Sequence, residues 1–450
     1  MSRIALIGKN SLGYVEKLIS IWNTQNCAVL IDWRIPIKTS VQLMREAGVS
    51  KCLLNNSQYK LLQGNLPDDI MFVPFDDECA NVMFLSEDII EQFVPNYSKD
   101  EAVIIYSSGT TGKSKGIILS HYAINTNADA IINYLKPNAT DCMYMIKTIS
   151  HSSSLVGELL VAIKSKTKLL IAPTIVPPRY TLKNIEKYRV TKICINPTLL
   201  KMYIDEIRRK SYDIHTLGEI YVHGAKASKE LCIQAKDCFK NANVYFEYGL
   251  SEAGPRVSSQ KISNSSIDSV GKPIQEVLVT IVDENGIVVS TNQIGVIHVK
   301  TSGQYSGYVS GEAKFKSLYN NWLNTGDTGF FDECGELHIV NRIDDVINID
   351  AHKIYPNEIE EAILCLSGIN ECAVVELENS RMKFLACLYV GKFLADKDIR
   401  AHLRAHLPTY EIPQCFVHCH QIPCTINGKR SKTLIKEEII KRIGMEKTND

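Results

Sequence analysis

The segment that decides how this chain is interpreted begins at Tyr106, ends at Gly116 and reads YSSGTTGKSKG. It holds three glycines, two lysines and five serine or threonine hydroxyls. Glycine lets the backbone bend and approach a ligand closely, free N–H and hydroxyl groups can face phosphate oxygens, and lysine adds positive charge. Surface turns are rich in the same residue types. Because the segment follows the apolar run AVII at 102–105, it favours a nucleotide polyphosphate site over a simple turn.

The Walker pattern G-x-x-x-x-G-K-[ST] is the first kind of phosphate loop to compare. Gly112, Lys113 and Ser114 fit its end, but the position of its first glycine is Ser107. The segment is also followed by IILSH, a second apolar run rather than a clear helix start. A P-loop nucleotide hydrolase is therefore an alternative that the sequence disfavours.

The composition limits the other function classes. A chain of 450 residues can form two or three domains with large cores. Lys and Arg together number 50, as do Asp and Glu, so no basic field favours nucleic acid or an anionic membrane. No apolar stretch reaches the roughly 20 residues of a spanning helix, and MSRIALIGKN lacks a signal-peptide cleavage pattern. The 14 cysteines, scattered through apolar segments, suggest reduced thiols and a cytoplasmic protein.

The order of apolar and amphipathic runs predicts the fold class. RIALIG, LGYVEKLISIWNTQ and CAVLID follow one another as strand, helix and strand, and similar alternation continues to about residue 260. This order predicts a layered α/β domain with a largely parallel sheet. Residues 277–342 are rich in strand-like runs, and after residue 345 we expect a smaller α+β unit with helices near 356–367 and 396–406.

A cluster of metal-binding residue types lies near the C-terminus, in CFVHCHQIPC. It contains Cys415, His418, Cys419, His420 and Cys424, but their spacing is not that of a zinc finger. The alternation of side chains predicts a strand here, and metal binding is the disfavoured alternative.

Taken together, these segments resemble the adenylate-forming (AMP-binding) superfamily, which includes acyl- and aryl-CoA ligases and stand-alone adenylation enzymes. The loop at 106–116 is similar to the phosphate loop of that family. Four more family-like segments follow in the family's order: YFEYGLSEAG, NWLNTGDTGFFDECGELHIVNRIDD, HKIYPNEIEEAI and IPCTINGKRSK. The resemblance covers about residues 3–435, and the chain looks shortened at its N-terminus. It implies an N-terminal AMP-binding domain at 1–343, with mixed sheets and a β-rich subdomain. A small mobile α+β domain at 344–450 would carry the catalytic lysine.

The resemblance also implies that ATP and Mg²⁺ bind here. The expected nucleotide-binding residues are Ser107, Ser108, Gly109, Thr110, Thr111, Gly112, Lys115, Gly224, Ala225, Lys226, Tyr248, Gly249, Ser251, Asp327 and Arg342. Among them, Tyr248 would pack on the adenine, Ser251 would lie near the α-phosphate and Asp327 would accept the ribose hydroxyls. Glu252 would hold Mg²⁺, because one carboxylate with waters and substrate phosphates is the usual magnesium arrangement.

Three further residues acquire roles from the resemblance. Lys429 would reach the substrate carboxylate and the α-phosphate, Asp344 would be the hinge between domains, and Ala351 would line the path of the acceptor thiol. The family's glycine before Arg342 is Asn341 here, and we expect a mild departure because asparagine tolerates positive φ.

The segment TISHSSSLVGELL matches the family's substrate pocket. His151 would flank the substrate carboxylate, although a core histidine is the alternative. Relatives that activate α-amino acids place an aspartate at the next position, and the residue here is Ser152. A hydroxyl cannot offset the desolvation of a buried ammonium, so we expect a neutral aliphatic or aromatic acid.

The expected function is therefore ATP-dependent activation of a carboxylic acid to an acyl-adenylate, with release of pyrophosphate and transfer to a thiol, for which CoA is expected. The alternative is a stand-alone adenylation enzyme that loads an acyl or aryl acid onto the phosphopantetheine of a carrier protein. A catalytically inactive binding protein of the same fold is disfavoured by the presence of Lys429, Glu252 and Asp327.

Overall fold

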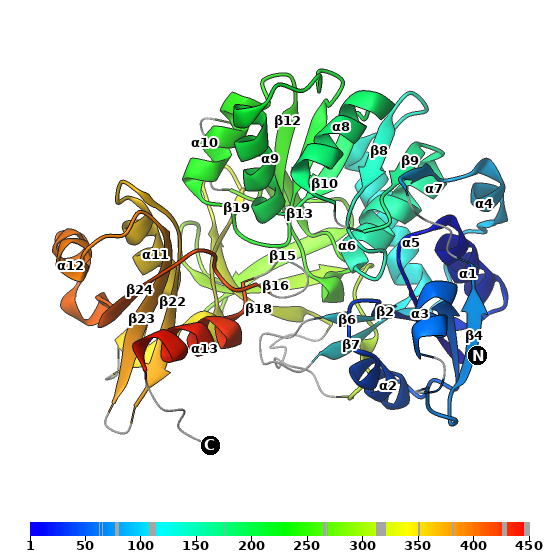
Figure 1. Ribbon diagram of the computed structural model, residues 1–450, viewed down its shortest axis with the longest axis horizontal. Coiled ribbons are helices and arrows are strands. Elements are labelled where there is room, and N and C mark those ends of the chain that lie inside the picture. Colours follow the sequence, from blue (N-terminus) through cyan, green and yellow to red (C-terminus); the bar gives the residue numbers. More distant parts are fainter. Residues whose placement is uncertain are drawn as a thin grey trace. The chain divides into compact units, whose positions relative to one another are not determined.

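The computed structural model describes most of the 450 residues. The residues outside this description are 63, 65, 77–80, 108–113, 175, 264–266, 268, 312–320, 350–351, 380–381, 425–429 and 445–450, together with the side chains of 107, 348 and 353. The described residues form two compact units (Figure 1). The first comprises 1–107, 114–325 and 329–339, and the second comprises 326–328 and 340–450. The predicted α/β class, with a large sheet-rich part and a small α+β part, is confirmed.

The first unit opens with a seven-stranded sheet in the order β17-β7-β6-β2-β1-β3-β4. Its strands are β1 (Arg3–Gly8), β2 (Cys27–Asp32), β3 (Lys51–Asn55), β4 (Met71–Phe75), β6 (Glu101–Ser107), β7 (Lys115–Ser120) and β17 (Gly307–Tyr308). The connecting helices are α1 (Leu12–Asn23), α2 (Ile37–Glu46) and α3 (Asn56–Leu62). Strand β2 is buried at every residue, as expected of a parallel strand covered on both faces. The predicted strand–helix–strand order at the N-terminus is confirmed.

The strands on either side of the glycine-rich segment settle which kind of loop it belongs to. β6 and β7 pair antiparallel, and Ser107 lies opposite Lys115. A Walker loop instead leads from a strand into a helix. The next element along this chain is a strand of the same sheet, so the P-loop alternative is wrong.

The second sheet has eight strands in the order β14-β13-β12-β11-β10-β8-β9-β5. Its parallel strands are β8 (Cys142–Met145), β9 (Lys168–Ile171), β10 (Lys192–Ile195), β11 (Glu219–Val222) and β12 (Asn243–Tyr248). Its antiparallel strands are β5 (Met83–Phe84), β13 (Ser258–Lys261) and β14 (Lys272–Pro273). Helices α8 (Pro178–Tyr188), α9 (Pro197–Arg209) and α10 (Lys229–Cys238) lie side by side along this sheet (Figure 1).

The first unit has a further group of helices, which includes the segment expected to bind the substrate. The group consists of α4 (Glu87–Gln92), α5 (His121–Leu135), α6 (Ser152–Ser154), the π-helix η1 (Leu155–Leu160) and α7 (Val161–Ser165). η1 contacts both α5 and β8. The fully buried large side chains of the first unit include Leu6, Tyr14, Leu18, Leu30, Met44 and Tyr144.

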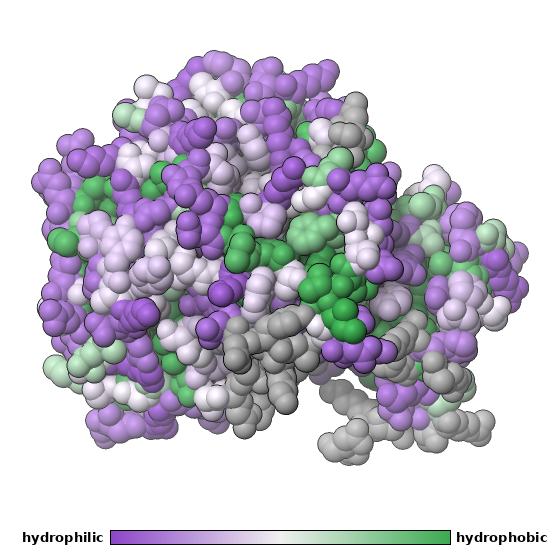
Figure 2. All heavy atoms as spheres, turned by 180° about the vertical axis from the view of Figure 1, so that it is seen from behind, coloured by the Kyte–Doolittle hydropathy of each residue, from purple (hydrophilic) through white to green (hydrophobic). Residues whose placement is uncertain are grey.

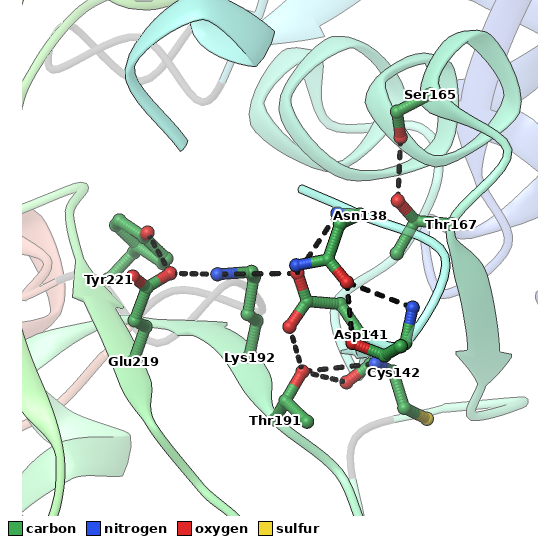
Figure 3. A network of polar contacts seen from close by, with 10 residues as sticks. Asn138, Asp141, Cys142, Ser165, Thr167, Thr191, Lys192, Glu219 and Tyr221 are labelled. Carbon is green, nitrogen blue, oxygen red and sulfur yellow. Dashed lines mark hydrogen bonds and ion pairs between the residues drawn. The ribbon is translucent and has the colours of Figure 1, made fainter. Parts of the chain in front are cut away.

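A charged cluster joins the amino ends of three strands of the second sheet (Figure 3). Lys192, the first residue of β10, contacts Glu219 at the start of β11, and its Nζ lies 3.7 Å from Asp141 Oδ2 before β8. Tyr221 donates its hydroxyl to Glu219 Oε2 at 2.5 Å, and Thr191 donates to Asp141 Oδ1 at 2.8 Å. The Lys192 side chain is only 8% exposed, so these contacts compensate a nearly buried charge. The cluster therefore lies at the amino ends of these strands, and α/β sheets bind ligands at the opposite, carboxyl ends.

The predicted β-rich region forms a four-stranded sheet in the order β15-β16-β18-β19. Its strands are β15 (Val277–Val282), β16 (Gly295–Thr301), β18 (Leu323–Phe331) and β19 (Leu337–Arg342). The central residues of β18, at 326–328, and the end of β19 belong with the second unit.

The second unit contains a small mixed α+β structure. Its strands are β20 (Ile347–Ile349), β21 (His352–Ile354), β22 (Ile369–Glu378), β23 (Lys383–Gly391) and β24 (Cys415–Cys419). Its helices are α11 (Pro356–Leu364), α12 (Asp396–Arg404) and α13 (Lys432–Ile443). The predicted helices near 356–367 and 396–406 and the strand at 415–419 are confirmed, whereas α13 was not predicted. Over the residues that the structure describes, no group of three His, Cys, Asp or Glu side chains could hold a metal ion.

On the face drawn in Figure 2, hydrophilic residues predominate among the coloured ones, and a group of hydrophobic residues lies near the centre of the view. Among the described helices, none has both the length and the apolar character needed to span a bilayer.

Candidate active site

The predicted site residues divide between the two units and the undescribed ranges. Ser108, Gly109, Thr110, Thr111, Gly112, Ala351 and Lys429 lie outside the described residues, as does the side chain of Ser107. The candidates in the first unit are Lys115, His151, Gly224, Ala225, Lys226, Tyr248, Gly249, Ser251 and Glu252, and those in the second are Asp327, Arg342 and Asp344. The roles assigned to these residues stay predictions.

Two predicted site segments meet in the first unit. Ser152 begins α6 after β8, and Ser251 begins the short 3₁₀ helix η2 (Ser251–Ala253) after β12. Their hydroxyl oxygens are 2.8 Å apart, and Ser152 is buried. Both residues follow the carboxyl ends of parallel strands, which is where sheets of this kind bind ligands. The segment expected at the substrate carboxylate therefore touches the segment expected at the α-phosphate.

Tyr308 connects two other candidates. Its hydroxyl donates to Glu252 Oε1 at 2.8 Å, and the Lys115 ammonium lies 5.3 Å from the centre of its ring. The backbone N–H of Tyr305 also donates to the Glu252 carbonyl at 2.9 Å. Glu252 is thus fixed from two sides. A single oriented carboxylate suits a magnesium ion whose other ligands are waters and phosphates. No spacing in the sequence pointed to Tyr308.

Glycines shape the two loops expected around the adenine. Gly224, after β11, has a φ of +94°, a conformation that other residues rarely adopt. Gly249 follows Tyr248 and allows close backbone approach, because a Cβ there would lie 2.0 Å from the Pro255 carbonyl oxygen. The Val257 N–H donates to the Tyr248 carbonyl at 3.0 Å. The chain therefore turns back tightly on itself around Ser251 and Glu252.

His151 lies within electrostatic reach of the first sheet. Asp32, at the end of β2, accepts a hydrogen bond from Arg34 at 2.5 Å. Burial alone would raise the pKa of Asp32, but the hydrogen bonds and charge of Arg34, with a smaller contribution from His151, lower it below its usual value.

Two buried ion pairs lie in the same unit as Ser152 and Ser251. Lys147, which follows β8, has its Nζ 3.3 Å from Glu158 Oε1 in η1 and 2.8 Å from His223 Nε2 after β11. Glu158 is 1% exposed, and burial raises the pKa of its carboxyl despite the nearby lysine. Glu158 was not among the residues predicted from the sequence. The signal was present, because Glu158 is a lone carboxylate in the apolar run SLVGELL.

The second ion pair joins β12 to the turn that follows it. Arg256 Nη1 lies 2.8 Å from Glu247 Oε2, and Tyr134 of α5 donates its hydroxyl to Glu247 Oε1 at 2.5 Å. Burial raises the pKa of the Glu247 carboxyl, and the Arg256 charge opposes this shift. A Cβ at Gly157 in η1 would lie 3.1 Å from Arg256 Nη2, so the arginine lies directly against η1.

In the second unit, the two predicted ribose and phosphate contacts are neighbours. Arg342 Nε lies 3.0 Å from Asp327 Oδ1, and Thr328 donates to the backbone carbonyl of Asn341 at 3.2 Å. The Asp327 side chain is 11% exposed and that of Arg342 is 39% exposed. The arginine therefore holds the carboxylate in place while keeping part of its own donor set accessible.

The reason expected to make Asn341 a mild departure, its tolerance of a positive φ, does not apply in this structure. Asn341 lies inside β19 and is not among the residues with positive φ. Its side chain is buried, and its Oδ1 accepts a hydrogen bond from Asn357 of α11 at 2.5 Å. The amide therefore ties the end of β19 to the first helix of the second unit.

Asp344 and the residues after Lys429 are also anchored within the second unit. Asp344 lies in the 3₁₀ helix η3 (Ile343–Asp345), where the Lys432 ammonium is 2.6 Å from Asp345 Oδ1. Arg430 donates to Glu360 at 3.0 Å and to the Cys372 carbonyl at 2.8 Å. The hinge role of Asp344 stays a prediction.

Comparisons with known proteins now define the class. The AMP-binding enzyme family model matches residues 1–309, and the model of the AMP-binding enzyme C-terminal domain matches residues 358–429. The chain belongs to the AMP-binding enzyme family. It is an enzyme of the adenylate-forming, ATP-binding type, and the predicted acid–thiol ligase class is confirmed.

The relatives include several CoA ligases. The chain is 26% identical to 4-coumarate–CoA ligase 4 of Arabidopsis thaliana, with 79% of this chain and 65% of that protein covered. It is 24% identical to 2-succinylbenzoate–CoA ligase of Enterococcus faecalis, covering 96% and 87%. It is also 25% identical to bacitracin synthase 2 of Bacillus licheniformis, covering 92% of this chain but only 17% of that protein.

Solved structures agree on the fold. ATP-bound MatB from Rhodopseudomonas palustris has a TM-score of 0.85 at 20% identity, covering 98% of this chain and 89% of that one. O-succinylbenzoate CoA synthetase from Bacillus subtilis, in complex with ATP and a magnesium ion, has a TM-score of 0.80 at 21% identity, covering 97% and 89%.

Proposed function

We propose that this enzyme joins a carboxylic acid to AMP, releasing pyrophosphate, and then transfers the acyl group to the thiol of CoA. The observation that carries the proposal is the 2.8 Å contact between Ser152 and Ser251. It joins the segment assigned to the acid with the segment assigned to the α-phosphate, beside an oriented Glu252. Family membership supplies the ATP chemistry, and the CoA ligases among the relatives support the acceptor.

In the first half-reaction, a carboxylate oxygen attacks the α-phosphorus and forms the acyl–phosphate bond. The bond from the α-phosphorus to the bridging oxygen breaks, and pyrophosphate leaves with its electron pair. Glu252 would position Mg²⁺ on the phosphates, and Lys429 would stabilise the charge that builds on the α-phosphoryl group. Asp327, whose Oδ1 lies 3.0 Å from Arg342 Nε, would accept ribose hydroxyls.

In the second half-reaction, the thiol sulfur attacks the acyl carbon, the thiol proton is lost, and AMP leaves with the ester oxygen. Asp344 would be the hinge and Ala351 would line the thiol path. The alternative acceptor is the phosphopantetheine of a carrier protein, favoured by the match to bacitracin synthase 2.

The acid is proposed to carry no α-ammonium group. Ser152 is a buried hydroxyl bonded to Ser251, and the buried carboxylate Glu158, six residues on, is already paired with Lys147. An ammonium group next to the reacting carboxylate would therefore be desolvated without a dedicated counter-charge. Aliphatic and aromatic acids without that group fit this environment.

The test is ATP–pyrophosphate exchange over a panel of aliphatic, aromatic and α-amino acids, followed by thioester analysis of the best acid with CoA and with a phosphopantetheinylated carrier protein. We expect exchange with acids lacking an α-ammonium, and a thioester with CoA. Dominant exchange with an α-amino acid would contradict the substrate class. A thioester on the carrier protein alone would favour the alternative acceptor.

Two variants separate the half-reactions. Asp344→Pro fixes φ and removes an N–H at the hinge, and Ala351→Leu adds bulk to the proposed thiol path. Both should lower thioester yield far more than exchange. Ala405→Leu, at an exposed alanine after α12 in the same unit, is the matched control. Equal losses in both half-reactions for Ala351→Leu would mean that it lines no acceptor path.

A further inference from the structure

A buried asparagine attaches the chain that leads to the proposed acid-binding residues to the first sheet. Asn10 follows β1 and directly precedes Ser11, the N-cap residue of α1, and it is only 2% exposed. The Ser11 hydroxyl accepts a hydrogen bond from the Tyr14 N–H at 3.0 Å, as N-cap residues do. The end of a strand and the start of a helix therefore fix the position of Asn10.

The amide of Asn10 matches the main chain at two strand ends of the second sheet. Its Nδ2 donates to the carbonyl of Lys147, after β8, at 2.8 Å and to that of Ala172, after β9, at 2.9 Å. Its Oδ1 accepts from the Ile149 N–H at 2.9 Å. A carboxylate at this position could not donate to the carbonyls, and an apolar side chain would remove all three bonds from buried backbone groups.

The residues that Asn10 holds lead into a tight turn. The His151 N–H donates to the Thr148 carbonyl at 3.2 Å, and the hydroxyl oxygens of Thr148 and Ser150 are 3.0 Å apart. These contacts lie within the turn, so they define its shape but not its place relative to the first sheet. The bonds of Asn10 can define that place, because they come from an element 139 residues earlier in the chain.

The turn ends at the residues assigned to the acid. Ser152 follows His151, and its hydroxyl oxygen lies 2.8 Å from that of Ser251, which is expected near the α-phosphate. The first sheet reaches this end of the turn as well, since Asp32, the partner of Gly8 across β1 and β2, interacts electrostatically with His151. A misplacement of about 1 Å can slow a reaction by about 100-fold. The place of the turn therefore matters for the reaction.

We propose that Asn10 is a positioning residue for the acid. By holding the main chain at Lys147 and Ile149, it sets where His151 and Ser152 meet the substrate carboxylate. Asn10 acts through the backbone and does not contact the substrate. This inference rests on the proposed acid-activating function.

The experiment compares Asn10→Ala with the loss of a matched buried amide in the same unit. Asn125 of α5 is 1% exposed, and it donates to the carbonyls of Asn96 at 2.8 Å and His121 at 3.0 Å. Its Oδ1 accepts from the Lys164 ammonium at 3.2 Å. Each amide thus makes two donations and one acceptance, and each alanine variant should lower the urea midpoint. Asn125→Ala therefore shows what the loss of such an amide does through stability alone.

The KM of each substrate in pyrophosphate exchange separates positioning from stability. A smaller folded fraction lowers the apparent kcat and leaves both KM values unchanged, because the enzyme that stays folded is normal. In Asn10→Ala, kcat/KM for the best acid of the panel should fall about 10- to 100-fold, with a higher KM for the acid and a KM for ATP within about twofold of wild type. Asn125→Ala should keep both KM values within about twofold of wild type.

A second variant guards against misfolding of Asn10→Ala. Asn10→Ser keeps one donor and one acceptor in a smaller side chain, so its KM for the acid should lie between those of wild type and Asn10→Ala. An acid KM that is unchanged in both Asn10 variants, or that rises equally in Asn125→Ala, would overturn this inference alone and leave Asn10 a stabilising contact. Absence of exchange by the wild-type enzyme with every acid would overturn the proposed function as well.

Discussion

Gly249 offers a sharp test of the turn that holds Ser251 and Glu252. An alanine Cβ at this position would lie 2.0 Å from the Pro255 carbonyl oxygen and 3.2 Å from the Arg256 Cα. Because these neighbours are backbone atoms, the turn must shift by about 1.4 Å to bring the 2.0 Å approach to an ordinary contact of 3.4 Å. Overpacking of this kind costs about 1–3 kcal/mol. The shift would also disturb the 2.8 Å contact between Ser152 and Ser251.

The assay combines the urea midpoint of the first unfolding transition with pyrophosphate exchange. Gly249→Ala should lower the midpoint by an amount that corresponds to about 1–3 kcal/mol, and should reduce exchange at least about tenfold. Gly218→Ala is the matched control, since its Cβ would meet only the Thr191 carbonyl, at 3.8 Å, without a positive φ. That variant should behave as wild type. If Gly249→Ala were as stable and active as Gly218→Ala, the tight turn around Ser251 would not position the site.

The other predictions concern separate parts of the chain. Lys192→Met should destabilise the first unit by about 3 kcal/mol, because it leaves Glu219 and Asp141 without their shared cation, and a urea melt within about 0.5 kcal/mol of wild type would refute this. Asp32, with its lowered pKa, should stabilise the fold fully above about pH 3.9 and less as pH falls through its lower folded pKa. The difference in midpoint between wild type and Asp32→Asn should therefore be constant from about pH 5 to 8 and shrink below about pH 4, and a difference that grows on acidification would contradict it. Lys429→Ala should reduce adenylate formation by about 10²–10³-fold while ATP binding, followed by calorimetry, is largely kept. Exchange within a few-fold of wild type would exclude this role.

Sequence periodicity predicted most of the fold because the elements are locally encoded. The buried parallel strands, such as β2, are uninterrupted apolar runs, and the helices between them carry a clear amphipathic repeat. The mismatch to the Walker pattern was informative for the same reason, since the apolar run after it forms β7 and not a helix. The final helix α13 was missed because its sequence, KTLIKEEIIKRI, is mostly polar and buries few side chains.

The parts of the site that were missed depend on partners distant in sequence. Tyr308 acquires its meaning only because β17 pairs with β7, which brings it to Glu252 and Lys115. Asn341 looked like a glycine substitute, but its amide serves Asn357 in the next helix. Glu158 was visible as a lone charge in an apolar run, yet its pairing with Lys147 depends on how η1 meets β8. Local patterns cannot specify such contacts.

The central claim is that an acyl-adenylate forms, and isotope transfer tests it most directly. The enzyme is incubated with Mg·ATP, CoA and its best acid labelled with ¹⁸O in the carboxylate, and the products are analysed by mass spectrometry. The account predicts AMP, pyrophosphate and acyl-CoA in equal amounts, with one ¹⁸O atom in the AMP, because a carboxylate oxygen attacks the α-phosphorus and leaves with AMP. ADP and phosphate as products, or AMP without the label, would contradict it.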